Sequence, residues 1–471
     1  VNGAEHSMDD VHDDFHDSAP GALAMTDASA KSPRVDGRNA GAFVAAAATS
    51  AAAFADLTVA SDDTKTLRRL IVRDTQRWVS VLRSVPLAHL APADRALYSA
   101  AVGAWSALER QDPRRAHAIV RLPTVSVLLE VIARAADSVA SVGDLVRELG
   151  ALVLFELACQ RALPPKGITV EVAVQPWLTL RSLSLRHVVA VDLGVGSALV
   201  FGPGWLAAGQ GDAQIKVGLA DLVRHGSAGP FTAQCAYHPI APGLMLATDD
   251  NNPLSDFEAH PDKEGNQLDL GGHDVAQWTT SLAESVALID RYLPLLGEEL
   301  KLLLRLVIPV GFDAERHLSA SYQEYIGAVY MTLHPNAMTM VEALIHEFQH
   351  NKLNAAFHHD TLLHNAFAPL FGSPVRPDPR PLHGVVLAVH AFQPVALLYA
   401  KMAADDHPWA ANPAWQRRAS AVFATIHEGA MTVLTNAEPT AAGLPFFDEM
   451  RRLDDALMAT AQSNGWRPAP A

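Results

Sequence analysis

The spacing of apolar residues changes twice along this chain of 471 residues, and each change limits the fold that the chain can adopt. In the first third, and again in the last 130 or so residues, apolar residues recur at three- and four-residue intervals, which is typical of helices with one buried face. The early helices are predicted over Thr66–Val85, Ala93–Glu109 and Val125–Leu163. Pro164 and Pro165 are expected to end the last of them.

The middle of the chain is richer in β-branched residues, which favours strands. Ile168–Val174 and His187–Leu193 are predicted strands, and Leu306–Val310 is a short apolar run that indicates a buried one. A helix is predicted over Val275–Leu304, and a strand pair over His317–Leu333. The fold class is therefore predicted to be α+β and mainly helical.

Four regions follow from these patterns. The sequence predicts a disordered acidic tail at residues 1–38, a helical region at 39–165, a mixed α/β region at 166–310 and a metal-binding catalytic region at 311–471. The tail combines many aspartates with three histidines, and it holds little apolar surface that folding could bury. Such a tract can bind metal weakly, but a solvated tail is the favoured interpretation.

Charge and cysteine content limit the partners of this chain. A formal net charge of −15 argues against a broad nucleic-acid surface, which requires clustered lysine and arginine. No run of about 18 apolar residues indicates a membrane span. The two cysteines, Cys159 and Cys235, are far apart, which fits a reducing cytoplasm without a disulfide framework or a thiolate zinc site. We therefore expect a cytoplasmic protein that binds neither nucleic acid nor membrane.

The stretch Met340–Phe357, which reads MVEALIHEFQHNKLNAAF, carries the clearest chemistry. Its apolar residues fall on one helical stripe, so a helix packed against a core is predicted. His346 and His350 are four residues apart, which places both imidazoles on the same face and within reach of one ion. Glu347 is offset by about 100° from His346, beside the ion, where it can orient or deprotonate a metal-bound water. The sequence therefore predicts a divalent metal centre with Glu347 as its catalytic residue.

The competing interpretation is a surface helix with two exposed histidines. At the His and Glu content of this chain, the pattern H-E-x-x-H arises by chance at a rate of roughly 5% per chain. However, a helix this apolar is expected to be mostly buried, and burying unpaired His and Glu side chains is costly. Those costs favour metal binding.

The two best-known zincin classes do not fit the residues that follow the motif. Leu353 and Ala356 occupy the positions at which a metzincin carries glycine and histidine, so that class is excluded. A thermolysin-like site takes a glutamate from a later helix as its third ligand. No glutamate occurs between Glu347 and Glu428, so that class is disfavoured as well.

Histidines are the remaining candidates for a third ligand. The apolar helix predicted over Leu382–Ala400 carries His390 in its middle and His383 seven residues earlier on nearly the same face. A lone histidine on such a helix is more often a core residue than a metal ligand. Because His346 and His350 require a third ligand, the two interpretations become about equally good. We choose His390, with His383 second. Three protein ligands would leave open positions, as catalysis requires, and nitrogen ligands suit zinc, iron or cobalt.

A proline-rich segment, VRPDPRPL, follows the predicted metal helix and contains Arg376 and Arg380. The prolines stiffen the segment, so these arginines are candidates to clamp a carboxylate bidentately near the metal. An ordinary surface loop is an equally good interpretation. Lys352, two residues after His350, is expected to face solvent.

The runs GAVYMTL, LIHEFQHNKLNA and DPRPLHGVVLAVHAF resemble the bacterial HEXXH-motif peptide-modification proteins, over about residues 300–400. The resemblance implies that His346, Glu347 and His350 form the site and that His390 with DPRPL is its downstream partner. It also implies a ribosomally made precursor peptide as substrate and iron(II)- and 2-oxoglutarate-dependent hydroxylation of a side chain. Arg380 would then hold the distal carboxylate of the 2-oxoacid.

An iron(II)/2-oxoglutarate-dependent hydroxylase is therefore the first hypothesis. Non-haem iron is usually held by two histidines and one carboxylate, so three histidines depart from that pattern unless Glu347 itself ligates. The alternative is a zinc metallopeptidase in which Glu347 activates water. A third hypothesis is a non-catalytic protein that grips a peptide, for example at the strand edge of Ile168–Val174.

Overall fold

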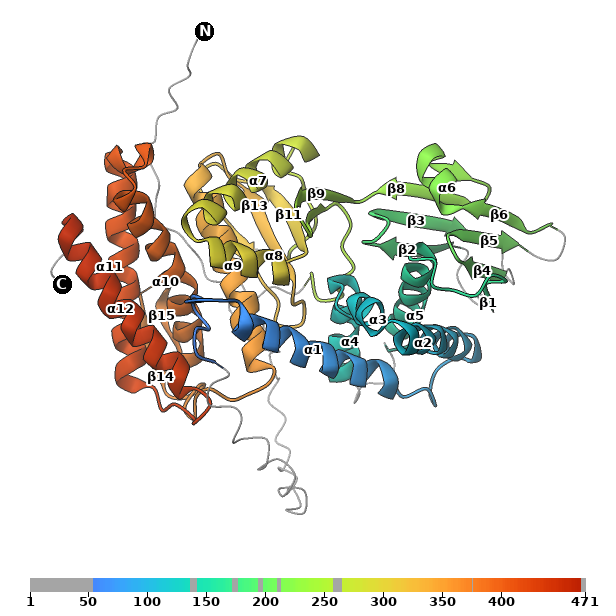
Figure 1. The fold of residues 1–471 in the computed structure, drawn as a ribbon, viewed down its shortest axis with the longest axis horizontal. Coiled ribbons are helices and arrows are strands. Elements are labelled where there is room, and N and C mark those ends of the chain that lie inside the picture. The colour runs from blue at the N-terminus through green and yellow to red at the C-terminus, as the bar shows by residue number, and fades with distance from the viewer. Residues whose placement is uncertain are drawn as a thin grey trace, which may run out of the picture.

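The computed structural model describes residues 54–135, 142–171, 177–193, 198–209, 213–256, 265–374 and 376–466. Within these ranges the predicted class is confirmed, because helices outweigh strands and the strands form several small sheets (Figure 1). The predicted acidic tail at 1–38 lies outside the described residues.

Five helices make up the N-terminal helical region: α1 (Lys65–Ser84), α2 (Pro92–Gln111), α3 (Pro113–Val120), α4 (Pro123–Arg134) and α5 (Val142–Cys159). Three of them begin on a proline, which suits the first position of a helix because the backbone N–H there has no partner within the helix. The single helix predicted over Val125–Leu163 is wrong, since α4 ends at Arg134 and α5 starts at Val142. The break was missed because apolar residues recur at helical spacing on both sides of it.

Two antiparallel sheets follow the helical region and lie beside α5 (Figure 1). The strands of the first are ordered β1 (Ile168–Glu171), β4 (Ala198–Gly202), β5 (Trp205–Gly209) and β6 (Ile215–Gly218). Those of the second are ordered β2 (Trp177–Ser182), β3 (His187–Asp192), β8 (Phe231–Cys235) and β7 (Ser227–Ala228), with the short helix α6 (Leu219–His225) packed nearby. The strands predicted at Ile168 and His187 are thus confirmed.

A third sheet lies at the centre of the molecule, with strand order β12 (Ser319–Ala320), β13 (Ala328–Leu333), β11 (Leu306–Phe312), β10 (Leu244–Ala247) and β9 (Tyr237–Ala241). Its middle strands β10, β11 and β13 run parallel, and β12 forms an antiparallel edge. Both the buried strand at Leu306 and the strand pair over His317–Leu333 are confirmed. The helix predicted over Val275–Leu304 is two helices, α7 (Val275–Tyr292) and α8 (Pro294–Leu303), because Pro294 starts a new helix.

The C-terminal part contains four long helices: α9 (Ala337–Phe357), α10 (Leu382–Ala404), α11 (Pro413–Asn436) and α12 (Leu444–Asn464). α9 stands between the central sheet and the bundle of α10, α11 and α12 (Figure 1). By length and hydropathy α10 could cross a membrane, as could the bent pair α3–α4 if it counted as one span, but 83% of the apolar window of α10 is buried inside the protein. Its apolar character is therefore explained by packing.

The segment Phe54–Val59, called the N-terminal strap, packs against the C-terminal helices, which are distant from it in sequence. Phe54 and Leu57 are fully buried in the same apolar cluster as residues of α10 and α12. The backbone N–H groups of Thr58 and Val59 donate to the carboxylate of Glu449 on α12, at 2.9 to 3.1 Å. The strap therefore closes one side of the C-terminal bundle.

The carboxyl of Glu449 makes stability depend on pH, because burial raises its pKa to about 7 from an ordinary value of 4.5. The folded state then holds a proton that the unfolded chain has already released, so stability is fully present below about pH 4.5 and is lost as pH rises through 7. We expect the free energy of unfolding to fall by up to about 3 kcal/mol over that window from this group.

Chemical denaturation between pH 4.5 and 8 measures this effect. Glu449→Gln, which cannot ionise, is expected to show a flatter pH dependence than the unaltered protein. The exposed Glu428 of α11 provides the matched control, Glu428→Gln, which should leave the dependence unchanged. Equal pH slopes in the unaltered protein and Glu449→Gln would contradict the prediction.

Candidate metal centre

The helix α9 is buried on nearly every side. The side chain of Asn336 caps its first turn by accepting from the N–H of Met338 at 2.9 Å. From Met340 to Ala356 every residue is buried, because the central sheet, α1, α7, α8 and α10 all pack around the helix. The sequence predicts one buried stripe, and the structure buries the polar positions as well.

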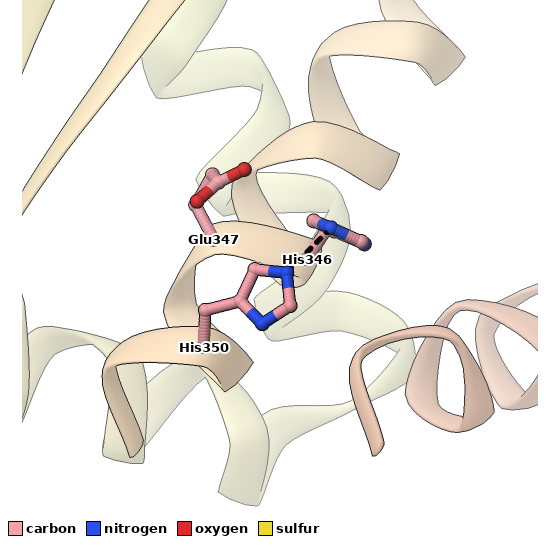
Figure 2. A group of neighbouring side chains, drawn as sticks. All are labelled: His346, Glu347 and His350. Atoms are coloured by element: carbon pink, nitrogen blue, oxygen red, sulfur yellow. Dashed lines mark hydrogen bonds between the residues drawn. The ribbon is translucent and has the colours of Figure 1, made fainter. Parts of the chain in front are cut away.

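His346 and His350 face each other across one turn of α9, as their spacing predicts (Figure 2). Their Nε2 atoms are 2.7 Å apart, and the ring planes cross at 88°. Each residue is only 5% exposed. Two imidazole nitrogens are therefore directed at one point within the protein interior.

The pair passes a geometric test for an ion after a small adjustment. Two nitrogens bound at 2.0–2.1 Å in a tetrahedral site lie about 3.3 Å apart. The observed 2.7 Å must therefore widen by about 0.6 Å. Ligand atoms of His346, Glu347 and His350 all lie within 4.8 Å of one another, and among the described residues no other group of three His, Cys, Asp or Glu meets that condition. The donors present are two imidazoles and one carboxylate.

Two polar residues that the sequence analysis did not select fix the carboxylate of Glu347. The hydroxyl of Ser321, directly after edge strand β12, donates to Glu347 Oε2 at 2.5 Å. Asn351 Nδ2 in turn donates to Ser321 Oγ at 3.1 Å, and Asn351 Oδ1 accepts from the N–H of Gly327 at 2.7 Å. The central sheet thereby sets the direction of the carboxylate, which is 2% exposed. No motif in the sequence identifies Ser321.

Of the two candidate third histidines, His390 lies near enough to His350 for the charge of that ring to affect its pKa, but its ring contacts the N-terminal strap. His390 is fully buried on α10, and its Nε2 lies 3.3 Å from the carbonyl oxygen of Leu57 in the N-terminal strap. Burial, with the charge of Lys352, holds the pKa of His390 well below its usual value, so the ring is neutral. His383 lies in the first turn of α10, with Phe357 at 4.4 Å between ring centroids. Phe392 of α10 contacts His346, at 4.7 Å between ring centroids.

The proline-rich segment forms a hairpin rather than a loop. Its strand β15 (Arg376–Pro381) pairs with β14 (Leu370–Ser373) immediately before α10. Arg380 is 7% exposed, and its Nε lies 4.0 Å from Oδ2 of Asp378. The side chain of Arg376 lies outside the described part of the structure. A role for either arginine in holding a cosubstrate stays a prediction.

Lys352 corrects one expectation from the sequence. It does not face solvent, since its side chain is fully buried and its Nζ donates to Oε2 of Glu299 on α8 at 2.6 Å. The expectation was wrong because it assumed that α9 has an exposed face, whereas α8 covers that face and supplies the counter-charge. The pair thus connects α9 to α8.

The fold and site together define the chain as an α+β protein with a buried His-Glu-His group on a central helix. Comparison with known protein families and with curated proteins finds no match to this chain.

Proposed function

We propose that this protein is a metal-dependent enzyme that modifies peptides, with iron(II) and 2-oxoglutarate as cofactor and cosubstrate for hydroxylation of a side chain. The observation that carries the proposal is the donor set of His346, Glu347 and His350. Two histidines with one carboxylate are the ligands of non-haem iron oxygenases. A ligand role for Glu347 also removes the need for His390 as the third ligand.

The residues of the chain have separate roles in this proposal. His346 and His350 hold the ion, and Ser321 keeps the Glu347 carboxylate in place through the 2.5 Å hydrogen bond. Phe392 covers one imidazole and limits the access of water. Arg380 is proposed to bind the distal carboxylate of 2-oxoglutarate. When bound, the iron supplies the activation of oxygen by which the 2-oxoacid is decarboxylated and the substrate hydroxylated.

The proposed substrate is a ribosomally made precursor peptide, following the resemblance of residues 300–400 to the HEXXH-motif peptide-modification proteins. The test is co-expression with the peptide encoded nearest to this protein, and then in vitro turnover with iron(II), 2-oxoglutarate and air. A peptide mass increased by one oxygen, with one succinate formed per peptide, is expected. An intact peptide and unconsumed 2-oxoglutarate would refute the proposal.

A zinc metallopeptidase is the second candidate, because the fixed carboxylate of Glu347 also suits a general base beside a metal-bound water. In that case the protein with zinc cleaves the peptide, and the cleavage requires neither oxygen nor 2-oxoglutarate.

Glu347→Gln distinguishes the two candidates by metal content as well as by activity. If Glu347 is a ligand, as we propose, the variant loses iron affinity together with hydroxylation, because a neutral amide is a poor replacement for a carboxylate ligand. If Glu347 is a general base, zinc stays bound and cleavage alone is lost. The metal content of the purified variant shows whether the ion stays bound, and the mass of the peptide shows whether it is hydroxylated or cleaved. Unchanged product formation would contradict both enzymatic proposals.

A further inference from the structure

A pocket lies where α1, the end of α8 and the turn that follows α3 meet. Its floor is apolar, formed by Trp78, Leu302 and Ile326 among others, and its charged lining comes from Arg121, Arg305 and Asp74. The cavity is small, about 20 Å³, and it opens to solvent. The pocket shares no lining residue with the His-Glu-His group.

The two arginines of this pocket are not neutralised by acids, unlike their neighbours. Within the described residues, the guanidinium of Arg121 has no hydrogen-bond or ion-pair partner. The hydrogen bonds of Arg305 go to the carbonyl oxygens of Gly243 and Lys301, at a long 3.4 Å each. By contrast, Arg77 pairs with Glu130 and Arg134 with Glu324 close by.

The pKa values of the two arginines reflect their burial and their proximity to each other. Burial, with the positive charge of Arg305, lowers the pKa of Arg121, and burial lowers that of Arg305. The pocket therefore brings together two half-buried cations, neither of which has a carboxylate partner in the described structure. An anionic ligand between them would offset their mutual repulsion.

The acid in the pocket, Asp74, is already engaged on its other side. Its Oδ1 lies 2.9 Å from Nε2 of His359 and 3.5 Å from Nδ1 of His358, both at the C-terminal end of α9. Those hydrogen bonds keep the pKa of Asp74 low despite burial. No hydrogen bond or ion pair in the described structure joins Asp74 to Arg121 or Arg305, so neither guanidinium is paired with this carboxylate.

We propose that this pocket binds an oxyanion group, a carboxylate or a phosphate, between Arg121 and Arg305. A guanidinium presents paired N–H donors in a fork that fits two oxygens of such a group, so two guanidinium groups can hold one anion from both sides. The apolar floor lowers the local dielectric constant and strengthens the attraction. The site is separate from the proposed metal chemistry and does not depend on it.

Protection of arginines from phenylglyoxal, read residue by residue by mass spectrometry, tests the site on the full-length protein. Inorganic phosphate forms one arm and glutarate the other, so that the experiment also decides between phosphate and carboxylate. We expect one of them to slow modification of both Arg121 and Arg305 at least tenfold. Arg224, an exposed arginine of α6, is the internal control and should be modified at the same rate throughout.

Calorimetric titration with the protecting anion then measures affinity in variants. Arg121→Gln and Arg305→Gln are each expected to weaken binding by about tenfold or more, as for the loss of charge-assisted hydrogen bonds. Arg224→Gln should bind as the unaltered protein does. Protection by neither anion, or equal protection of Arg224, overturns the proposal, as does unchanged affinity in both pocket variants that keep the circular dichroism of the unaltered protein.

Discussion

Replacing either His346 or His350 with alanine is expected to reduce metal affinity by more than about 100-fold and to abolish catalysis. Loss of a residue that merely orients a metal ligand costs 10–100-fold in affinity, so loss of a ligand itself must cost at least the upper end of that range. The two Nε2 atoms face each other at 2.7 Å, and neither has a nearby histidine to replace it within the group.

Metal content per chain after anaerobic reconstitution with iron(II), or with zinc in parallel, measures this effect. The exposed His225 at the end of α6 gives the matched control, His225→Ala, which should bind one ion per chain. His390→Leu tests the remaining third-ligand interpretation, and we expect it to keep its metal because Nε2 of His390 lies against the Leu57 carbonyl. Full metal binding by His346→Ala would refute a metal centre at this position.

Replacing Lys352 with methionine is expected to destabilise the fold by about 3–5 kcal/mol, because it leaves the carboxylate of Glu299 buried without a counter-charge. Both side chains are fully buried, and the pair is 2.6 Å apart. Burial raises the pKa of Glu299 even beside the lysine, so an isolated carboxylate there would take up a proton or draw in water. Glu299→Met should be similarly destabilising.

The double variant Lys352→Met/Glu299→Met provides the decisive comparison. With both charges removed, we expect it to be more stable than either single variant, which gives a large coupling free energy in a double-mutant cycle. The exposed pair of Arg68 with Glu298, adjacent to Glu299 in sequence, serves as control, since Arg68→Met should change stability little. Midpoints of chemical denaturation measure all four. Additive losses in the double variant would show that the pair is not coupled.

The helix α9 and the shared face of its two histidines were predictable because their determinants are local. The spacing of His346 and His350 sets their common face, and the apolar residues around them predict burial. The breaks between helices were less predictable: Pro294 was visible in the sequence, but it lies within a stretch whose apolar period continues on both sides.

The support of the site was not predictable, because it comes from residues distant in sequence. Ser321 reaches Glu347 only because β12 forms the sheet edge beside α9, and Lys352 is buried only because α8 covers it. Similarly, the prediction of His390 as a ligand did not anticipate that the N-terminal strap would lie against its ring. A sequence pattern gives the face of a helix but not the identity of what packs there.

The N-terminal strap also sets an order of events during synthesis. Thr58 leaves the ribosome 391 residues ahead of the glutamate that will accept its N–H, a delay of roughly 20–80 s at ordinary elongation rates. Gln349 of α9, which donates to the Thr58 carbonyl at 2.7 Å in the finished protein, follows Thr58 by 291 residues and is therefore made before Glu449. A nascent chain that stops short of α12 therefore lacks the carboxylate that accepts the N–H groups of the strap.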